Sequence, residues 1–378
     1  MPLKLTGMSE VFLTDFKSRP GRSLPKKMEL LVKAAGIGRL DCKDKFTAIK
    51  IHFGELGNLA FIRHNYASRM VELLGKTGAR TFLTDTNTLY SGSRSNAVDH
   101  LHTAYLNGYN PISVPGAPVI IADGLKGTDQ VMIPIPGGEY CREALIASAI
   151  AKADVLVSMT HFKGHEQTGF GGTLKNLGMG SASVAGKLHL HSDSKPVIER
   201  ANCTGCRQCV MNCRHGAVTL DAGKIAVINY DICVGCGQCV AVCQYDAAQA
   251  GESSSAQGLT AKIAEYAWAA LQGKAHFHVS FIMDVSPFCD CWGMNDIPIV
   301  PNIGILASFD PLALDQACFD LVKKSPATSG SLADPGGTDS RLGEDKFLCI
   351  HPRTDAEFGL THAQKIGIGS RSYTLIEI

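Results

Sequence analysis

Short apolar runs alternate with longer stretches of helical spacing along the first 160 residues. An apolar run of four to eight residues suits a buried strand, and apolar positions three or four apart suit a helix. Strands alternating with helices predict an α/β fold, with a mostly parallel sheet covered by helices on both faces. The predicted strands are 46–53, 79–83, 118–122, 131–135 and 153–158, and the predicted helices are 60–74, 96–106 and 141–152.

The same alternation returns after residue 250. Apolar side chains recur at helical spacing from Leu259 to Ala270, and strands are predicted at 276–283 and 303–307. Asp310 is a predicted N-cap, because a proline follows it at the first position of a helix. Since the α/β pattern stops and later resumes, the segment between is predicted to be an insertion. The expected domains are an α/β domain formed by 1–195 and 251–378, and an inserted domain at 196–250.

The inserted segment carries eight of the 14 cysteines. They form two runs, 203–213 and 233–243, each with the spacing C-x2-C-x2-C-x3-C. In bacterial ferredoxins, three close thiolates hold one [4Fe–4S] cluster and the fourth cysteine reaches the other cluster. The sequence therefore predicts a ferredoxin-like α+β module with two [4Fe–4S] clusters. The predicted ligands are Cys203, Cys206, Cys209 and Cys243 for one cluster, and Cys233, Cys236, Cys239 and Cys213 for the other.

Zinc knuckles are the alternative for these cysteines. The ligand pairs of zinc sites usually lie further apart in sequence, so the spacing favours clusters. One departure is that Arg214 and Gln244 follow the fourth cysteines, where the bacterial ferredoxin pattern has proline. A disulfide framework is not expected, because the start of the chain lacks the apolar segment of a secretory signal.

Charge and hydropathy narrow the expected partners. Lys and Arg (36) nearly balance Asp and Glu (35), which gives no support to a nucleic-acid partner. No stretch reaches the roughly 18 apolar residues needed to cross a bilayer, so no membrane association is expected. We therefore expect a cytoplasmic protein.

A glycine-rich segment follows the apolar strand predicted at 153–158. In open α/β sheets, ligands bind at the carboxyl ends of strands. The lysines can neutralise a small anionic substrate, and the histidines can bind a metal ion or move protons. We predict a reactive loop here, and the alternative is a glycine-rich turn with solvated side chains. The catalytic candidates are His161, Lys163, His165 and Lys175.

A C-x-C motif with an intervening aspartate follows another predicted strand. Cys289 and Cys291 can bind a soft metal or form a redox pair. Two buried thiols beside a tryptophan are an equally good interpretation. With His161 and His165, these cysteines are candidate ligands of an additional metal ion.

Further polar and thiol side chains are weaker candidates. The stretch after the strand at 79–83 offers substrate contacts, although a polar surface loop explains it equally well. His189 and His191 suit a metal site or, more simply, a turn. The remaining cysteines are expected in the core. The substrate-contact candidates are Asp85, Asn87, Arg94, Asn96 and His100, and the expected core cysteines are Cys42, Cys141, Cys318 and Cys349.

Several long motifs resemble one family. They are the segments 161–180, 191–196 and 297–311 together with the cysteine module. The chain is similar to the "domain of unknown function" family 362 of bacteria and archaea, whose members carry an inserted ferredoxin domain. The resemblance implies iron–sulfur binding and an α/β fold, and it implies no particular reaction.

Two functional hypotheses follow. The first is a redox enzyme in which electrons pass from the clusters to a substrate or metal in the α/β domain. It predicts that His161, Lys163, His165, Cys289 and Cys291 converge near one cluster. The second is a non-catalytic electron carrier or assembly partner that docks onto another redox protein. There is no G-x-G-x-x-G after a strand and no G-x-x-x-x-G-K-[ST], which argues against nicotinamide binding and ATP-driven reduction.

Overall fold

The centre of the molecule is an eight-stranded sheet with the order β16-β1-β15-β14-β7-β2-β3-β4. A computed structural model describes residues 8–90, 92–191, 195–213, 215–233, 239, 243–249, 254–336 and 341–378. Within the sheet only β15 runs antiparallel to its neighbours, so the predicted mostly parallel α/β sheet is confirmed. The strands are β1 (Ser9–Asp15), β2 (Phe46–Ile51), β3 (Arg80–Asp85), β4 (Val119–Ile121), β7 (Val155–His161), β14 (Ala275–Ile282), β15 (Gly304–Ser308) and β16 (Tyr373–Glu377).

Strand β7 lies inside the sheet and is buried at all seven positions. Its side chains alternate between two apolar cores, with Leu156 in one and Val155 and Val157 in the other. A parallel strand that is covered on both faces has apolar residues at nearly every position. This continuous apolar run explains why β7 could be located from the sequence alone.

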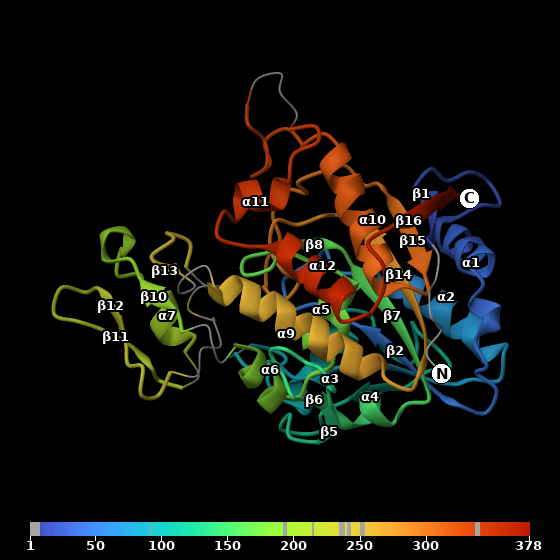
Figure 1. Cartoon of the computed structure of the whole chain (residues 1–378), viewed down its shortest axis with the longest axis horizontal. Coiled ribbons are helices and arrows are strands. Elements are labelled where there is room, and N and C mark those ends of the chain that lie inside the picture. Colours follow the sequence, from blue (N-terminus) through green and yellow to red (C-terminus); the bar gives the residue numbers. More distant parts are fainter. Residues whose placement is uncertain are drawn as a thin grey trace.

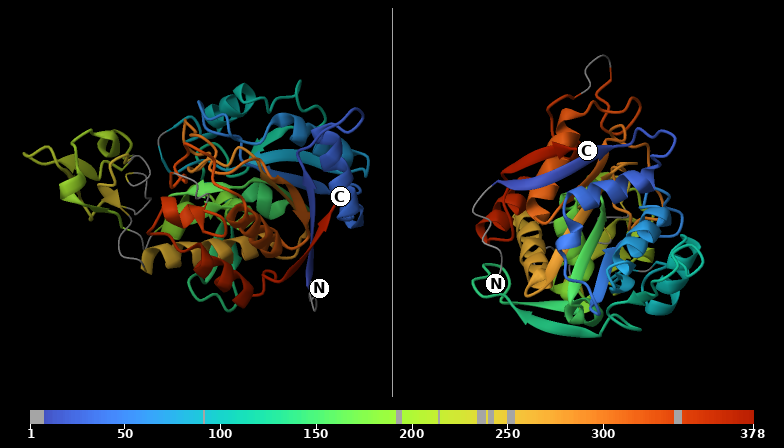
Figure 2. Two further views of the ribbon diagram at one scale, coloured as in Figure 1. Left: turned by 90° about the horizontal axis from the view of Figure 1, so that it is seen from above. Right: turned by 90° about the vertical axis from the view of Figure 1, so that its right-hand side faces the viewer.

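Helices cover both faces of the sheet (Figures 1 and 2). One core lies under α1 (Leu24–Ala34), α2 (His64–Gly75) and α3 (Ala97–Leu106). The other lies under α5 (Thr173–Leu177), α9 (Ser254–Leu271), α10 (Pro311–Lys324) and α12 (Ala356–Lys365). Asp310 caps α10 as expected, because its carboxylate accepts from the backbone N–H groups of Leu312 and Ala313.

The cysteine-rich segment forms its own small strands and core beside the main body (Figure 1). Strand β10 (Val197–Ile198) pairs with β13 (Ala248–Gln249), and β11 (Val218–Leu220) pairs with β12 (Ala226–Ile228). The first cysteine run continues into the short helix α7 (Gln208–Met211). We call the described residues between 195 and 249 the cysteine module.

The helix predicted at 141–152 is wrong in its first half. Residues Glu143–Ala147 form β6, which pairs antiparallel with β5 (Gln130–Pro134), and only Ser148–Lys152 form a helix, α4. Ala144 and Ile146 alternate into the core, as strand side chains do. A short apolar run has no periodicity that separates a strand from a buried helix, and the hairpin partner decides the outcome here.

The glycine-rich segment is neither a loop nor a solvated turn. Lys163–His165 form β8 and Gly169–Gly171 form β9, and the two pair as a hairpin whose strand residues are all buried. Among the cysteines expected in the core, Cys42, Cys141 and Cys318 are buried but Cys349 is exposed. Elements near both ends were not predicted, including β1, α1, β16 and α11 (Lys346–Ile350).

None of the helices in the described ranges is both long enough and apolar enough to span a membrane.

Candidate functional site

A cavity of about 120 Å³ opens at the carboxyl ends of the neighbouring parallel strands β2, β3 and β7, beside the segment that follows β14. The helices α5 and α6 (Val184–His191) contribute its other side. This is the edge at which open α/β sheets bind ligands. The volume is below the roughly 300–1,000 Å³ of pockets for drug-sized ligands, so the cavity suits a small molecule.

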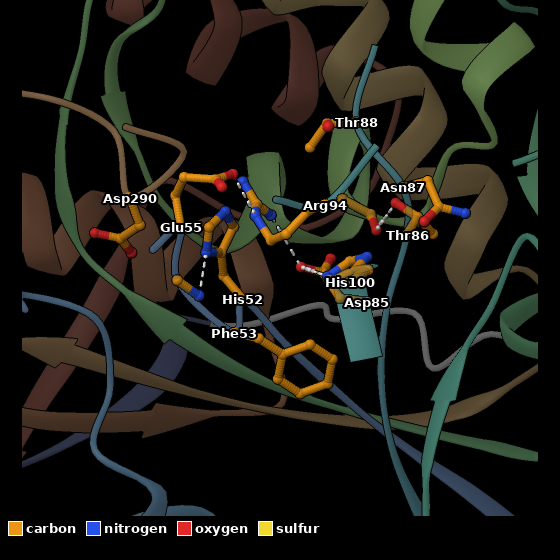
Figure 3. A network of polar contacts seen from close by, with 12 residues as sticks. His52, Phe53, Glu55, Asp85, Thr86, Asn87, Thr88, Arg94, His100 and Asp290 are labelled. Carbon is orange, nitrogen blue, oxygen red and sulfur yellow. Dashed lines mark hydrogen bonds and ion pairs between the residues drawn. The ribbon is translucent and has the colours of Figure 1, made fainter. Parts of the chain in front are cut away.

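One wall of the cavity is a buried ion network (Figure 3). Lys50 Nζ lies 2.9 Å from Asp85 Oδ1, and Arg94 Nη1 lies 3.5 Å from Asp85 Oδ2. Arg94 also donates through Nε to Glu55 Oε2 at 3.0 Å. Burial by itself would raise the pKa of Asp85, but Lys50 and His100 outweigh it and hold that pKa well below its ordinary value. The wall is therefore a set of charges fixed in paired positions.

The polar stretch after β3 mostly lies inside the protein. Asp85 and Arg94 line the cavity. His100 is buried behind them with Nε2 3.7 Å from Asp85 Oδ2, and Asn87 donates to Asp123 Oδ1 at 2.9 Å. Asn96 instead caps α3 with its side-chain oxygen. The surface-loop alternative is therefore wrong for the buried members of this stretch.

His161 and Lys163 converge on Asp290. His161 Nδ1 lies 2.8 Å from Asp290 Oδ1, and its Nε2 lies 2.8 Å from the backbone oxygen of Met283. Lys163 Nζ lies 3.3 Å from Asp290 Oδ2. Burial would raise the pKa of Asp290, but the charges of His161 and Lys163 outweigh it, so the pKa is lowered. With both ring nitrogens engaged, His161 acts as a support for the Asp290 carboxylate.

Cys289 and Cys291 both line the cavity. Lys175 Nζ is 3.7 Å from Cys289 Sγ, and His165 lines the same cavity. The neighbouring Cys291 thiol lowers the pKa of Cys289 well below its ordinary value, with Lys175 and His165 adding to the effect. The Cys289 thiol, together with burial, raises the pKa of Cys291. Of the two thiols, Cys289 is therefore the more readily ionised.

Trp292 links the cavity to the cysteine module. Its indole N–H donates to Glu166 Oε1 at 2.7 Å, and its ring packs against the module's apolar core. Burial raises the pKa of Glu166, and the nearby Cys289 sulfur adds to the rise. A hydrogen bond from Arg353 to Gln249 is a second contact between the two parts.

Buried polar nitrogens that have no hydrogen-bond partner in the described part of the chain also line the cavity. Among the described residues, neither His191 Nδ1 nor Gln167 Nε2 has a hydrogen-bond partner, although both side chains are buried. Lys187 Nζ donates to Thr86 Oγ1 and to the backbone oxygen of Ala182, both of which are neutral. Burial lowers the pKa of Lys187 to about 8. Buried donors are normally paired, so this wall suits an anionic ligand.

The structure brings the sequence candidates together around one cavity. His161, Lys163, His165, Lys175, Cys289 and Cys291 all line it. His191 lines it too, whereas His189 bonds to the hydroxyl of Tyr266. Sequence reasoning missed Lys50, His52, Glu166, Gln167 and Lys187. A lysine inside an apolar strand is a signal that could have found Lys50, but no local pattern marks Lys187.

The additional metal ion stays a prediction. In the described ranges, no three or more His, Cys, Asp or Glu side chains are grouped closely enough to hold one ion.

Four cysteines of the module surround a second, smaller cavity. Cys203, Cys206 and Cys209 come from the first run, and Cys243 comes from the second. Backbone N–H groups point at the sulfurs, with Ala226 N 3.4 Å from Cys203 Sγ and Ala248 N 3.3 Å from Cys243 Sγ. Thiolates that ligate clusters accept such bonds, so these contacts suit thiolate ligands, and the [4Fe–4S] cluster itself stays a prediction.

The second predicted ligand set is described in part. Cys213, Cys233 and Cys239 all contribute to the module's core. The N–H of Ala217 lies 3.2 Å from Cys213 Sγ. Cys236 lies outside the described residues.

The fold and site define an α/β protein with a ligand cavity at the carboxyl edge of a mostly parallel sheet. The chain belongs to the family named Domain of unknown function (DUF362), which matches residues 47–320. No curated protein matches it.

Two solved structures show distant similarity. One is the lactate racemase apoprotein from Thermoanaerobacterium thermosaccharolyticum, with 14% identity and a TM-score of 0.37 over 75% of this chain and 53% of that one. The other is a protein from Thermotoga maritima, with 13% identity and a TM-score of 0.34 over 78% of this chain and 57% of that one. The chain thus spans little more than half the length of either structure.

Proposed function

We propose that this chain is an iron–sulfur oxidoreductase that binds two [4Fe–4S] clusters in an inserted ferredoxin-type module. It transfers electrons to a small anionic substrate in the cavity at the edge of the sheet. The observation that carries the proposal is that the four cysteines around one small cavity come from both cysteine runs. Cys203, Cys206 and Cys209 are joined there by Cys243 from the other run. This crossed arrangement is the one that bacterial two-cluster ferredoxins use.

The cysteines of the module would hold the clusters as the spacing predicts. Cys203, Cys206, Cys209 and Cys243 would hold one, and Cys213, Cys233, Cys236 and Cys239 the other. When bound, each cluster supplies one-electron transfer. The backbone N–H groups that reach Cys203 and Cys243 stabilise the negative charge on the sulfurs.

Residues of the cavity at the sheet edge would bind the substrate. Lys175 and Lys187 present positive charge to the cavity without a carboxylate partner among the described ion pairs, and the Gln167 side-chain amide offers a donor. Charge-assisted hydrogen bonds to such groups hold carboxylates, sulfonates or phosphates. His161 and Lys163 pair with Asp290 beside Cys289, which keeps the C-x-C motif in place.

A redox partner protein would supply the electrons. The cysteine module exposes Cys206 together with the apolar side chains of Met211 (63% exposed) and Ile232 (47% exposed). Exposed apolar side chains of this kind suit a transient protein contact. They also favour the second candidate function, a non-catalytic carrier or assembly partner. That function predicts a chain that holds iron but binds no anion in the cavity.

Metal analysis of anaerobically purified protein tests the proposal. We expect about eight irons and an equal amount of sulfide per chain. Because Cys203 and Cys243 serve the same cluster, Cys203→Ala, Cys243→Ala and the double variant should each retain about four irons. Combining Cys203→Ala with Cys233→Ala should remove nearly all iron. Cys349→Ala, which alters an exposed thiol outside the module, is the matched control. A colourless protein that holds only zinc would refute the proposal.

A further inference from the structure

The C-x-C motif is held in a tight turn. The N–H of Trp292 donates to the backbone oxygen of Cys289 at 3.1 Å, which closes a four-residue β-turn. Asp290 anchors the turn from inside through its ion pairs to His161 and Lys163. Because the Asp290 side chain is paired inside the protein, both flanking cysteines can line the cavity.

Polar groups surround these two sulfurs. Lys175 Nζ lies 3.7 Å from Cys289 Sγ, and His165 and Tyr90 line the same cavity. The buried Cys42 and Cys318 instead belong to the apolar cores of the sheet, and neither lines this cavity. A thiol used only for packing needs no access to a cavity, whereas a reactive thiol sits in a positively charged, partly accessible setting.

We propose that Cys289 and Cys291 form a reversible redox pair that reduces a small disulfide bearing anionic groups. The charge preference follows from Lys175 beside the reacting sulfur and from Lys187 in the same cavity. The size limit follows from the cavity volume of about 120 Å³.

The exchange proceeds in two balanced steps. The Cys289 thiolate attacks one sulfur of the substrate, so a Cys289–substrate bond forms, the substrate disulfide breaks and one half leaves as a thiolate. Cys291 then gives up its proton to this leaving half and attacks Cys289 Sγ. The second half leaves as a thiolate and a Cys289–Cys291 disulfide remains. One disulfide is thereby reduced to one substrate thiol and one substrate thiolate while the protein pair is oxidised to a disulfide.

Two electrons and one proton return the pair to one thiolate and one thiol. The supply of these electrons rests on the proposed function, whereas the exchange with a substrate disulfide does not. Trp292 places the pair directly beside the cysteine module, because the residue that follows Cys291 packs against the module's core.

Mass spectrometry on the full-length chain, kept anaerobic, tests the pair. Three disulfides of similar size serve as probes: dithiodipropionate, which is anionic, bis(2-hydroxyethyl) disulfide, which is neutral, and cystamine, which is cationic. Alkylation followed by trypsin releases residues 275–323, a peptide that also contains Cys318 as an internal control. We expect the probe to remove two hydrogens from this peptide and to block alkylation of Cys289 and Cys291 but not of Cys318. The anionic probe should react about ten-fold faster than the cationic one.

Single-cysteine variants test the order of attack. Cys291→Ser should trap half of the probe on Cys289, because no second thiol can displace it. Cys289→Ser should form no adduct at a comparable rate. Cys318→Ser should behave like the wild type. If both cysteines stay fully alkylated after exposure to every probe, or if the cationic probe reacts fastest, the proposal is overturned.

Iron analysis of the same samples separates this inference from the proposed function. If the chain holds about eight irons but Cys289 and Cys291 are not oxidised by the probes, the redox pair is refuted and the cluster proposal is unaffected. If the chain holds no iron but Cys289 and Cys291 exchange with dithiodipropionate, the cluster proposal is refuted and the redox pair is unaffected.

Discussion

Trp292 donates its indole N–H to Glu166 at 2.7 Å, and this bond joins the cysteine module to the cavity at the sheet edge. Glu166 belongs to the hairpin of β8 and β9, and its Oε2 lies 3.9 Å from His165 Nε2. The module, the C-x-C turn and the hairpin therefore meet at one side chain. Substitutions at this point should show whether the contact contributes to stability.

A double-mutant cycle measures the bond between Trp292 and Glu166. Trp292→Phe removes the donor and Glu166→Ala removes the acceptor. We expect a coupling of about 1.5–3 kcal/mol in the free energy of unfolding, because hydrogen bonds to charged groups contribute about this much. Chemical denaturation of the two single variants and the double variant gives the value. The chain's other tryptophan supplies the control: Trp268→Phe and Glu166→Ala should be additive within about 0.5 kcal/mol. A coupling near zero at Trp292 would contradict the contact.

Asp290→Asn tests the anchor of the C-x-C turn. The substitution leaves Lys163 buried beside an uncharged partner, and breaking a buried ion pair from one side costs about 3–5 kcal/mol of unfolding free energy. The pKa of Asp290 is lowered in the folded state, so its charge stabilises the fold above the ordinary value of 3.8 and less so as the pH falls below it. The difference in unfolding free energy between the wild type and Asp290→Asn should therefore become smaller in acid.

Asp296→Asn is the matched control for this anchor, because Asp296 is exposed near the same turn. It should change the unfolding free energy by less than about 0.5 kcal/mol. Equal effects at Asp290 and Asp296 would mean that the buried ion pairs contribute no net stability.

The sequence predicted the elements whose signals are local. The continuous apolar run of β7 and the Asp310 cap of α10 were both located from neighbouring residues alone. The strands β1 and β16, near the two ends of the chain, were missed because they are half-exposed and lack a long apolar run. The first half of 141–152 was assigned wrongly, because only its pairing with β5 distinguishes it from a helix.

The candidate site was predicted in part for the same reason. His161 is the last residue of β7, and Lys163 and His165 follow it directly. The rule that ligands bind at the carboxyl ends of strands therefore pointed to them. Lys187 and His191 lie on α6, and only the tertiary fold brings that helix to the cavity. The burial of the glycine-rich hairpin also depends on contacts with a distant segment, which no local pattern encodes.

Sulfate binding should depend on the protonation of Lys187. Its pKa is lowered to about 8, so the side chain loses its charge as the pH rises through that value. Sulfate keeps its own charge over this range, and its affinity should therefore fall above about pH 8. The charged groups that face Lys187 are Asp123, Asp85, Lys50 and Arg94.

Isothermal titration with sulfate, at an ionic strength held constant with chloride, checks this dependence. Lys187→Met should weaken binding about ten-fold near neutral pH, where one charge-assisted bond is lost. At high pH the sulfate affinities of the wild type and Lys187→Met should become equal. Lys126→Met, which removes an exposed lysine, is the control and should bind like the wild type. If the sulfate affinities of the wild type and Lys187→Met depended on pH in the same way, Lys187 would not be part of the anion site.

Gly164→Ala tests how closely the hairpin must approach the C-x-C segment. A Cβ at Gly164 would lie 2.0 Å from the backbone oxygen of Pro287, while the N–H of Gly164 donates to Ser286 at 2.8 Å. Because the obstacle is backbone, the two segments must separate. We expect a loss of about 1–3 kcal/mol in unfolding free energy. His165 should also move away from Cys289, which should slow the reaction of Cys289 with dithiodipropionate.

Gly258→Ala is the contrasting control for this substitution. Gly258 lies inside α9 with no atom within 4 Å of an added Cβ. Alanine is the better helix former by about 1 kcal/mol, so this variant should be at least as stable as the wild type and react at the same rate. If Gly164→Ala kept both the stability and the Cys289 reaction rate of Gly258→Ala, the close packing of the hairpin against Pro287 would not be what positions His165.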